Sequence, residues 1–544
     1  MEAKDMFDQK TAEVVGEQPA SPRVGDVSAE LSEYGIHRGL KSHHIQLMAI
    51  SGVIGTGLFV GTSGVLNSAG PAGLLIGYSL WCVLLLFVAH AMGEISALLP
   101  VPGSFVSHIG RFVDESASVA MGWVYAYRIF VAADCTALTG LWAYWFPDIN
   151  PGVWVASTLS VVFALNCLAV KYFGEVEFCA SILKVLLIFG FLLFALIVVC
   201  GGNPHHERIG FKYWVNPGAF NEQYIEGGGG RFLAIWGVFN TAAFAIGGPD
   251  FIANCAPEAV NPRRNIPKAV KRVIYRLIFF FILSVFFVGL LVPYNDPTMV
   301  SALATGNGVA KSPFIIAMNK LDIPFLPDLC NAVIITSAWS CTNCLLFQAS
   351  RTVFGLAKHG RAPAIFAKTT KSGVPLPALI LSIAVSSLAF LTCNTASAVV
   401  LNWFINLGST AIMIAYLMML VSNIRFHHGL KAQGIDLSTL PFKSRLTPWG
   451  NYFALFWIGI ILLTNGYGVF IKGHWKFVDF FTAYFTIVFF VVIYLGWKIV
   501  KRTPFIKAKD MDFQTGLAEV ELHESRLNYK PPAGKYDKAM DWLF

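Results

Sequence analysis

The residues best placed to do chemistry are the backbone groups of a glycine-rich run, Ser51–Gly61, which has four glycines in eleven residues. The run lies inside an apolar segment of about residues 44–66. A helix in lipid has no water to satisfy its backbone, so these glycines favour a helix that opens at mid-depth around a ligand. Freed N–H groups suit a carboxylate, and freed carbonyls suit an ammonium group or a cation. We therefore predict a binding site centred on Gly55, Thr56 and Gly57, with close helix packing through small residues as the alternative.

Three ionisable side chains lie deep in other apolar segments, where such residues are functional candidates by default. Arg128 and Asp134 share the segment at about 118–146. On one helix they would stand ~240° and ~9 Å apart, so each needs a partner elsewhere, either a ligand or a charge on a neighbouring span. Lys184 lies in the segment at about 177–200. Its amine either reaches the cytosolic interface or stands beside the glycine run, in the place of a cation, and exchanges a proton there.

The composition identifies the chain that positions these groups as a polytopic membrane protein. It has 544 residues, of which 55 % are hydrophobic and 13 % charged, and its mean hydropathy is +0.60. Apolar stretches of about 20 residues are long enough to cross a hydrocarbon core. We predict an all-α membrane protein with about twelve transmembrane helices, at about residues 44–66, 73–97, 118–146, 152–171, 177–200, 231–254, 273–293, 328–356, 376–396, 398–423, 451–471 and 476–499.

The distribution of basic residues predicts the topology. The loop after the sixth span carries six Lys and Arg residues, and the loops after the eighth and tenth carry four each. The opposite-side loops at 201–230 and 294–325 carry four in total. By the positive-inside rule both termini are cytosolic, which gives a tail at 1–43, a transmembrane domain at 44–499 and a second tail at 500–544. The net charge of +8 therefore reflects topology and not a nucleic-acid partner.

The sixth span carries a second interruption, Phe244–Asp250, in which two glycines, a proline and an acid break an apolar run. Paired interruptions five spans apart indicate a 5+5 inverted repeat with discontinuous helices 1 and 6 around a midplane site. Asp250 either caps the second half-helix, contacts the ligand, or does both. Phe244 and Trp339 are candidate aromatic lids over the ligand, with core or lipid packing as the alternative.

The polar segments argue against an enzyme, since they contain no nucleophile–base constellation and no metal-ligand spacing. Cys341 and Cys344 have the spacing of a redox motif, but they lie in an apolar run and are predicted to pack there. We expect no cofactor.

Several motifs, in order along the chain, resemble the fungal amino-acid permeases of the amino acid-polyamine-organocation superfamily. They are Gly39–Gln46, Ile54–Gly61, Met92–Glu94, Pro102–Phe105, Tyr172–Phe178, Glu258–Val270, Ser337–Ser340 and Ser350–Ala357. The resemblance implies a plasma-membrane symporter that imports L-amino acids with protons by alternating access. It also implies a site made mainly by spans one, three, six, eight and ten.

The resemblance assigns roles to particular residues. It implies that Gly55, Thr56 and Gly57 bind the substrate carboxylate and that the carbonyls near Ala245 and Ile246 bind its amino group. Lys184 matches the lysine that the family carries in span five, which implies proton coupling. The partners implied are the amino acid, the lipid bilayer and the ubiquitin ligase machinery, which would act on tail lysines such as Lys4 and Lys10.

The sequence departs from the family pattern within the expected site, where Asp134 replaces the usual Glu, Arg128 replaces an uncharged residue, and Gly247–Asp250 replaces Gly-Thr-Glu or Gly-Ser-Glu. Arg128 would disfavour a cationic substrate, whereas Asp134 and Asp250 would favour one. The substrate class therefore stays open. Two alternatives remain beside the importer: an amino-acid sensor, and a carrier for polyamines or other organic cations.

Overall fold

The computed structural model describes residues 52, 54–101, 103–128, 131–167, 170–259, 261–305, 312–370, 373–395, 397–517 and 520–521. Every regular element in this part of the chain is a helix, and the described residues belong to one compact unit. The predicted all-α membrane fold is confirmed. The division into two tails and a transmembrane domain stays a prediction, and the predicted N-terminal tail lies outside the described residues.

Eight elements of the described chain are long and apolar enough to cross a membrane. They are η1 with α4 (Gly57–Gly61, Thr62–Leu98), α9 (Val170–Val199), α10 with α11 (Gly228–Ala245, Pro249–Cys255), α12 with η4 and α13 (Pro262–Arg276, Leu277–Ile282, Leu283–Leu291), α16 (Leu326–Lys358), α17 with η6 (Leu376–Ser386, Ser387–Cys393), α18 (Ser397–Gln433) and α20 (Phe477–Lys501). The shorter helices are α5 (Ser104–Phe112), α6 (Glu115–Arg128), α7 (Ala132–Trp142), α8 (Pro151–Cys167), α14 (Pro297–Thr305), α15 (Pro313–Asn319) and α19 (Trp449–Leu463).

The described part of every predicted span is largely helical, although the spans do not correspond to one helix each. Spans one and two run together through η1 and α4, with a kink where Gly70 adopts φ +73° ahead of Pro71. Span three is divided into α6 and α7, and the Val131 amide between them donates to Ser386 Oγ at 3.2 Å. The angle of ~240° expected between Arg128 and Asp134 on a single helix is therefore wrong, because the two residues stand on separate helices.

The predicted interruption of span six is confirmed. Helix α10 ends at Ala245, Ile246 is extended, and α11 begins at Pro249. Gly248 adopts φ +133°, which requires glycine, and proline suits the first position of α11 because it has no N–H to leave unpaired. The chain thus opens between two half-helices at the position where its glycine and proline residues predict it.

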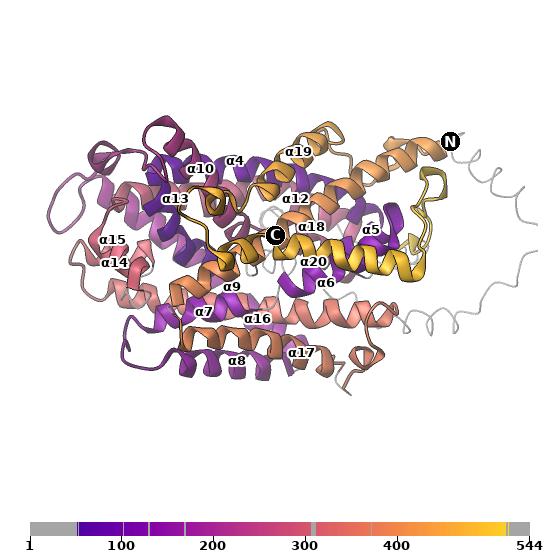
Figure 1. Cartoon of the computed structure of the whole chain (residues 1–544), viewed down its shortest axis with the longest axis horizontal. Helices are drawn as coiled ribbons and strands as arrows, with labels where there is room; N and C mark the ends of the chain where they lie inside the picture. Colours follow the sequence, from indigo (N-terminus) through magenta and orange to yellow (C-terminus); the bar gives the residue numbers. More distant parts are fainter. Residues whose placement is uncertain are drawn as a thin grey trace, which may run out of the picture. The chain divides into compact units, whose positions relative to one another are not determined.

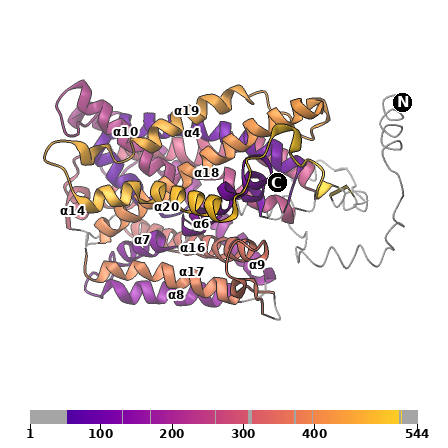
Figure 2. The ribbon, with the colours of Figure 1, turned by 45° about the vertical axis from the view of Figure 1, so that its right-hand side comes forward.

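The helices that surround the two interruptions pack closely. Helices α4 and α10 pack against each other, and α18 packs against α4, α6, α7 and α10. Helix α16 contacts α6, α7, α8 and α9 on another side. Figures 1 and 2 show α8 and α17 side by side along one edge of the bundle, with α16 and α7 next to them and α4, α10 and α19 along the opposite edge. The start of η1 and the breaks in spans three and six therefore lie between α16 and α18, whereas the part of span one before Gly52 lies outside the described residues.

Candidate functional site

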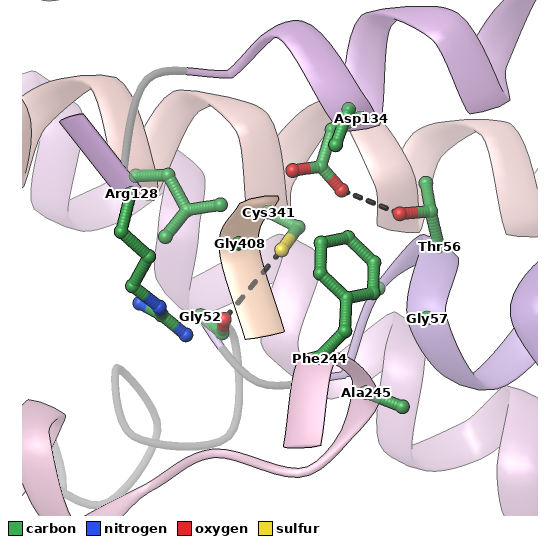
Figure 3. Close-up of a pocket in the computed structure, with 12 residues that line it drawn as sticks. Gly52, Thr56, Gly57, Arg128, Asp134, Phe244, Ala245, Cys341 and Gly408 are labelled. Carbon is green, nitrogen blue, oxygen red and sulfur yellow. Dashed lines mark hydrogen bonds between the residues drawn. The ribbon is translucent and has the colours of Figure 1, made fainter. Parts of the chain in front are cut away.

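A pocket lies where the start of η1 and the breaks of spans three and six meet α16 and α18 (Figure 3). Its wall comes from five of the predicted spans: one, three, six, eight and ten. The lining residues are Gly52, Gly55, Thr56, Gly57, Arg128, Ala133, Asp134, Phe244, Ala245, Cys341, Leu345 and Gly408. Seven of the eleven residues proposed from sequence are among them, whereas Ile246, Asp250, Trp339 and Lys184 stand outside the wall.

The first wall of the pocket is the start of a helix. Thr56 precedes η1, so the amide groups that follow it belong to a helix N-terminus, where N–H groups have no partner within the helix. Such an end carries partial positive charge and favours a carboxylate. A Cβ added to Gly57 would lie 2.6 Å from the Cα of Ala245, and a Cβ on Gly55 would lie 2.7 Å from Cys341 Sγ. The helix start therefore approaches α10 and α16 as closely as it does only because these positions are glycines.

The second wall is the end of a helix. The Ile246 amide donates to the carbonyl of Ala242 at 2.9 Å and closes the last turn of α10, after which the chain becomes extended. The final carbonyls of a helix lack partners within it and carry partial negative charge, which favours an ammonium group. Because Ala245 lies against Gly57, the positive end of one helix and the negative end of another border the same space.

Asp134 is tied to the first helix by a hydrogen bond. Thr56 Oγ1 donates to Asp134 Oδ1 at 2.6 Å, and both side chains are buried (Figure 3). The bond joins the helix start to α7 across the pocket wall. The partner that sequence reasoning required for Asp134 is therefore a hydroxyl of the predicted binding run.

Arg128 finds its partner on α11. Its Nη1 lies 3.4 Å from Asp250 Oδ2, and the side chains are 12 % and 0 % exposed. Tyr125 donates its hydroxyl to the same carboxylate oxygen at 3.0 Å, and the Gly248 amide donates to Oδ1 at 3.3 Å. Figure 3 shows Arg128 extending away from Asp134. Asp250 thus accepts the backbone N–H of Gly248, the residue that precedes α11, as a capping side chain does, and it also holds the break of span six against α6.

Lys184 and Trp339 lie away from the pocket wall. Lys184 is 0 % exposed, so its amine does not reach the protein surface, and its ammonium interacts electrostatically with Asp134 and Glu177. The Trp339 indole N–H donates to Thr158 Oγ1 at 3.2 Å, and its ring lies 6.0 Å from that of Trp142. The packing alternative therefore describes Trp339.

The remaining lining residues give the pocket an apolar side. Phe244 lies over Gly408, where an added Cβ would stand 3.3 Å from the ring, and Leu345 and Cys341 come from α16. Five lining residues were not predicted. Gly52 belongs to the predicted glycine run, and the other four are ordinary residues of apolar helices: Ala133, Cys341, Leu345 and Gly408. The one available signal was Gly408, an isolated glycine within a helical run, which often marks a close approach.

Comparison with known proteins shows which families and proteins the chain resembles in sequence. Residues 44–509 match the family model described as amino acid permease. The chain is 39 % identical over 526 residues to a proline-specific permease of Emericella nidulans, covering 95 % of each chain. It is 35 % identical over 520 residues to the dicarboxylic amino acid permease of Saccharomyces cerevisiae, covering 94 % of this chain and 85 % of the relative. It is 36 % identical over 498 residues to the lysine-specific permease of the same yeast, with 91 % and 80 % covered.

A likeness to a solved structure supports the fold. A manganese transporter of Eremococcus coleocola aligns with a TM-score of 0.53 at 13 % identity, over 84 % of this chain and 94 % of that one. At this identity the comparison concerns the arrangement of helices alone.

Proposed function

Because the chain belongs to the amino acid permease family, we propose that it is a proton-coupled symporter that imports neutral L-amino acids across the plasma membrane by alternating access. The observation that carries the proposal is the pocket between the start of η1 and the end of α10. A zwitterionic amino acid has a carboxylate, which suits the positive start of η1, and an ammonium group, which suits the negative end of α10. The two helix ends present these partial charges across a single space. The two helix ends thus recognise the α-carboxylate and the α-ammonium group, which all amino acids share.

The charges around the pocket favour a neutral side chain. Arg128 and Asp250 neutralise one another, and the Asp134 carboxylate, which is also in the wall, interacts with the Lys184 ammonium. The wall that would face the substrate side chain is formed by Phe244, Leu345 and Gly408, which are apolar or small. Two proline-specific permeases, of Emericella nidulans and Saccharomyces cerevisiae, are each 39 % identical to the chain, which agrees with this choice.

Alternating access requires an element that opens and closes. The Arg128–Asp250 pair, with Tyr125, joins α6 to α11 beside the pocket. In the topology we propose, with both termini cytosolic, these helices lead from the pocket toward the cytosol. Separating the pair would open that route, so we assign it the role of an inner gate that breaks once in each cycle.

Proton coupling is assigned to Lys184. Its buried ammonium interacts with Asp134, which is bonded to Thr56 at the helix start. A proton leaving or reaching Lys184 would change the field at the Asp134–Thr56 pair and hence at the carboxylate site. The proton is the only coupling ion in this proposal, and no resident cofactor takes part.

The cytosolic tails are proposed to serve regulation. Lys4 and Lys10 lie outside the described residues and are proposed as acceptors of ubiquitin when the carrier is withdrawn from the surface. In a variant both lysines are replaced by Arg. If this variant keeps its uptake under conditions that remove the wild-type protein from the surface, the result would agree with that role.

The experiment that tests the function is uptake of radiolabelled neutral, acidic and basic amino acids and one polyamine, in cells that lack their own permeases, with and without a protonophore. Protonophore-sensitive accumulation of the neutral class is expected. Accumulation of the polyamine alone would favour the organic-cation carrier, and surface-exposed protein that accumulates nothing would favour the sensor.

A further inference from the structure

A second buried carboxylate, Glu177, lies in the bundle outside the pocket wall. It stands on α9 and is 1 % exposed. Its Oε2 accepts a hydrogen bond from Ser340 Oγ at 2.7 Å, and its Oε1 accepts one from Asn343 Nδ2 at 2.8 Å, both from α16. Asn166 of α8 donates in turn to Asn343 Oδ1 at 2.8 Å. These donors are neutral, so they solvate the carboxylate without balancing its charge, and a buried charge requires a counter-charge.

Lys184 supplies that counter-charge from the same helix. It follows Glu177 by seven residues, which is about two turns and ~10 Å along one helix face. A long side chain on a helix points back toward the N-terminus, so the Lys184 amine extends toward the turn that holds Glu177. The Lys184 ammonium interacts electrostatically with Glu177 and with Asp134. The two carboxylates with which it interacts are therefore one of the pocket wall and one nearer the start of α9.

The other titratable groups that face this pair come from helices packed against α9. Asp134 faces it from α7, and the thiols of Cys341 and Cys344 face it from α16. Cys255 of α11 lies close to Cys344. Of these groups, Asp134 and Glu177 are the two carboxylates, and an ammonium interacts more strongly with a carboxylate than with a neutral thiol.

We propose that Glu177 is a second proton carrier of the transport cycle, which takes the proton from Lys184 and passes it toward the cytosolic end of α9. This inference rests on the proposed function, because it presumes that Lys184 carries the coupled proton. In the step an N–H bond of the ammonium breaks and its electron pair stays on nitrogen, while an O–H bond forms at Glu177. An ammonium and a carboxylate become an amine and a carboxylic acid, so the net charge of the pair is zero before and after.

The geometry gives the proton a path distinct from that of the substrate. Asp134 belongs to the pocket wall, whereas Glu177 is outside that wall and is held by Ser340 and Asn343 of α16. A proton that enters at the Asp134 side and leaves at the Glu177 side crosses the bundle without following the amino acid through the gate at Arg128. The neutral pair formed in transit avoids the cost of an isolated charge in the low-dielectric interior.

The test uses Glu177→Gln, which keeps the shape of the side chain and removes its charge. Full-length protein in vesicles with the membrane potential clamped at zero is given a gradient of about one pH unit, which sustains about tenfold accumulation at one proton per substrate. The variant is expected to exchange external for internal substrate with wild-type KM but to accumulate none, and to move no protons by an internal pH dye. Glu226→Gln, on an exposed loop residue, is the matched control and is expected to behave as wild type.

Wild-type accumulation by Glu177→Gln would overturn the inference. If this variant does not fold, Glu177→Asp keeps the charge on a shorter side chain and is expected to slow proton-driven uptake while exchange is unchanged; equal rates for both processes would also overturn it. A wild-type protein that accumulates nothing in response to the pH gradient would instead contradict the proposed function. A Lys184→Met variant that loses coupling while Glu177→Gln keeps it would contradict the role of Glu177 alone.

Discussion

Replacing Gly57 by alanine tests whether the closeness of the two half-helices makes the binding site. The added Cβ would lie 2.6 Å from Ala245 Cα and 2.9 Å from Ala245 Cβ. Both are shorter than real Cβ contacts, and the nearer neighbour is backbone, so the strain cannot be relieved by a rotamer change. The start of η1 and the end of α10 must move apart by several tenths of an ångström.

The magnitude follows from the cost of inserting a methyl group into a close-packed contact, which is about 1–3 kcal/mol. If that strain is borne by the substrate-bound state, where the two helix ends must close on one zwitterion, affinity falls by about 5-fold to 150-fold. The rise is expected in KM for neutral amino acids, with the amount of protein at the surface changed less.

The assay is concentration-dependent uptake, normalised to surface protein measured by an epitope tag. Gly459→Ala on α19 is the matched control, since an added Cβ there meets no atom within 4 Å. Its KM is expected to equal that of the wild type. A Gly57→Ala variant with wild-type KM at normal surface abundance would refute the placement of the substrate between η1 and α10.

The remaining predictions concern single side chains around the pocket. Thr56→Val removes the donor to Asp134 and is expected to raise KM about 10-fold to 150-fold, because a hydrogen bond to a charged group contributes about 1.5–3 kcal/mol; an uptake curve that superimposes on wild type would contradict it. Asp250→Asn leaves the Arg128 guanidinium buried without its counter-charge, at a cost of about 3–5 kcal/mol. When the detergent-solubilised protein is heated, Asp250→Asn should lose its folded peak at a lower temperature than the wild type. The double variant Arg128→Asp with Asp250→Arg, which exchanges the two residues, should recover part of that loss in melting temperature. Equal melting temperatures for all three proteins would argue against the ion pair. Lys184→Met is expected to keep substrate exchange and lose accumulation driven by a pH gradient, so undiminished accumulation would exclude the amine from coupling.

The interruption of span six could be predicted because glycine and proline change backbone conformation locally. The glycine run likewise predicted a close approach, and Gly57 and Ala245 meet in the structure. The first half of span one lies outside the described residues, so its opening stays a prediction. The break in span three carries no such signal, since neither Arg128 nor Val131 is a helix breaker and the Val131 amide is satisfied by Ser386 from a distant span.

The pairing of charges could not be predicted, because it joins residues remote in sequence. Arg128 and Asp250 lie 122 positions apart, and no periodicity within either segment connects them. Composition likewise does not distinguish an aromatic residue that lines a pocket from one that packs between helices. The sequence made Phe244 and Trp339 equally good candidates for a residue that covers the ligand. Of the two, Phe244 lies on the pocket wall, whereas Trp339 donates a hydrogen bond to Thr158 on α8.

The measurement that tests the central claim most directly is uptake of a radiolabelled neutral amino acid, such as proline, by vesicles that contain only the purified protein and an imposed pH gradient. The account predicts that the labelled amino acid accumulates and that a protonophore abolishes this accumulation. Unlabelled acidic and basic amino acids are expected to compete only weakly with its uptake. Gly57→Ala is expected to impair accumulation, and Gly459→Ala is expected to leave it unchanged. Accumulation that ignores the pH gradient, or that Gly57→Ala leaves intact, would contradict it.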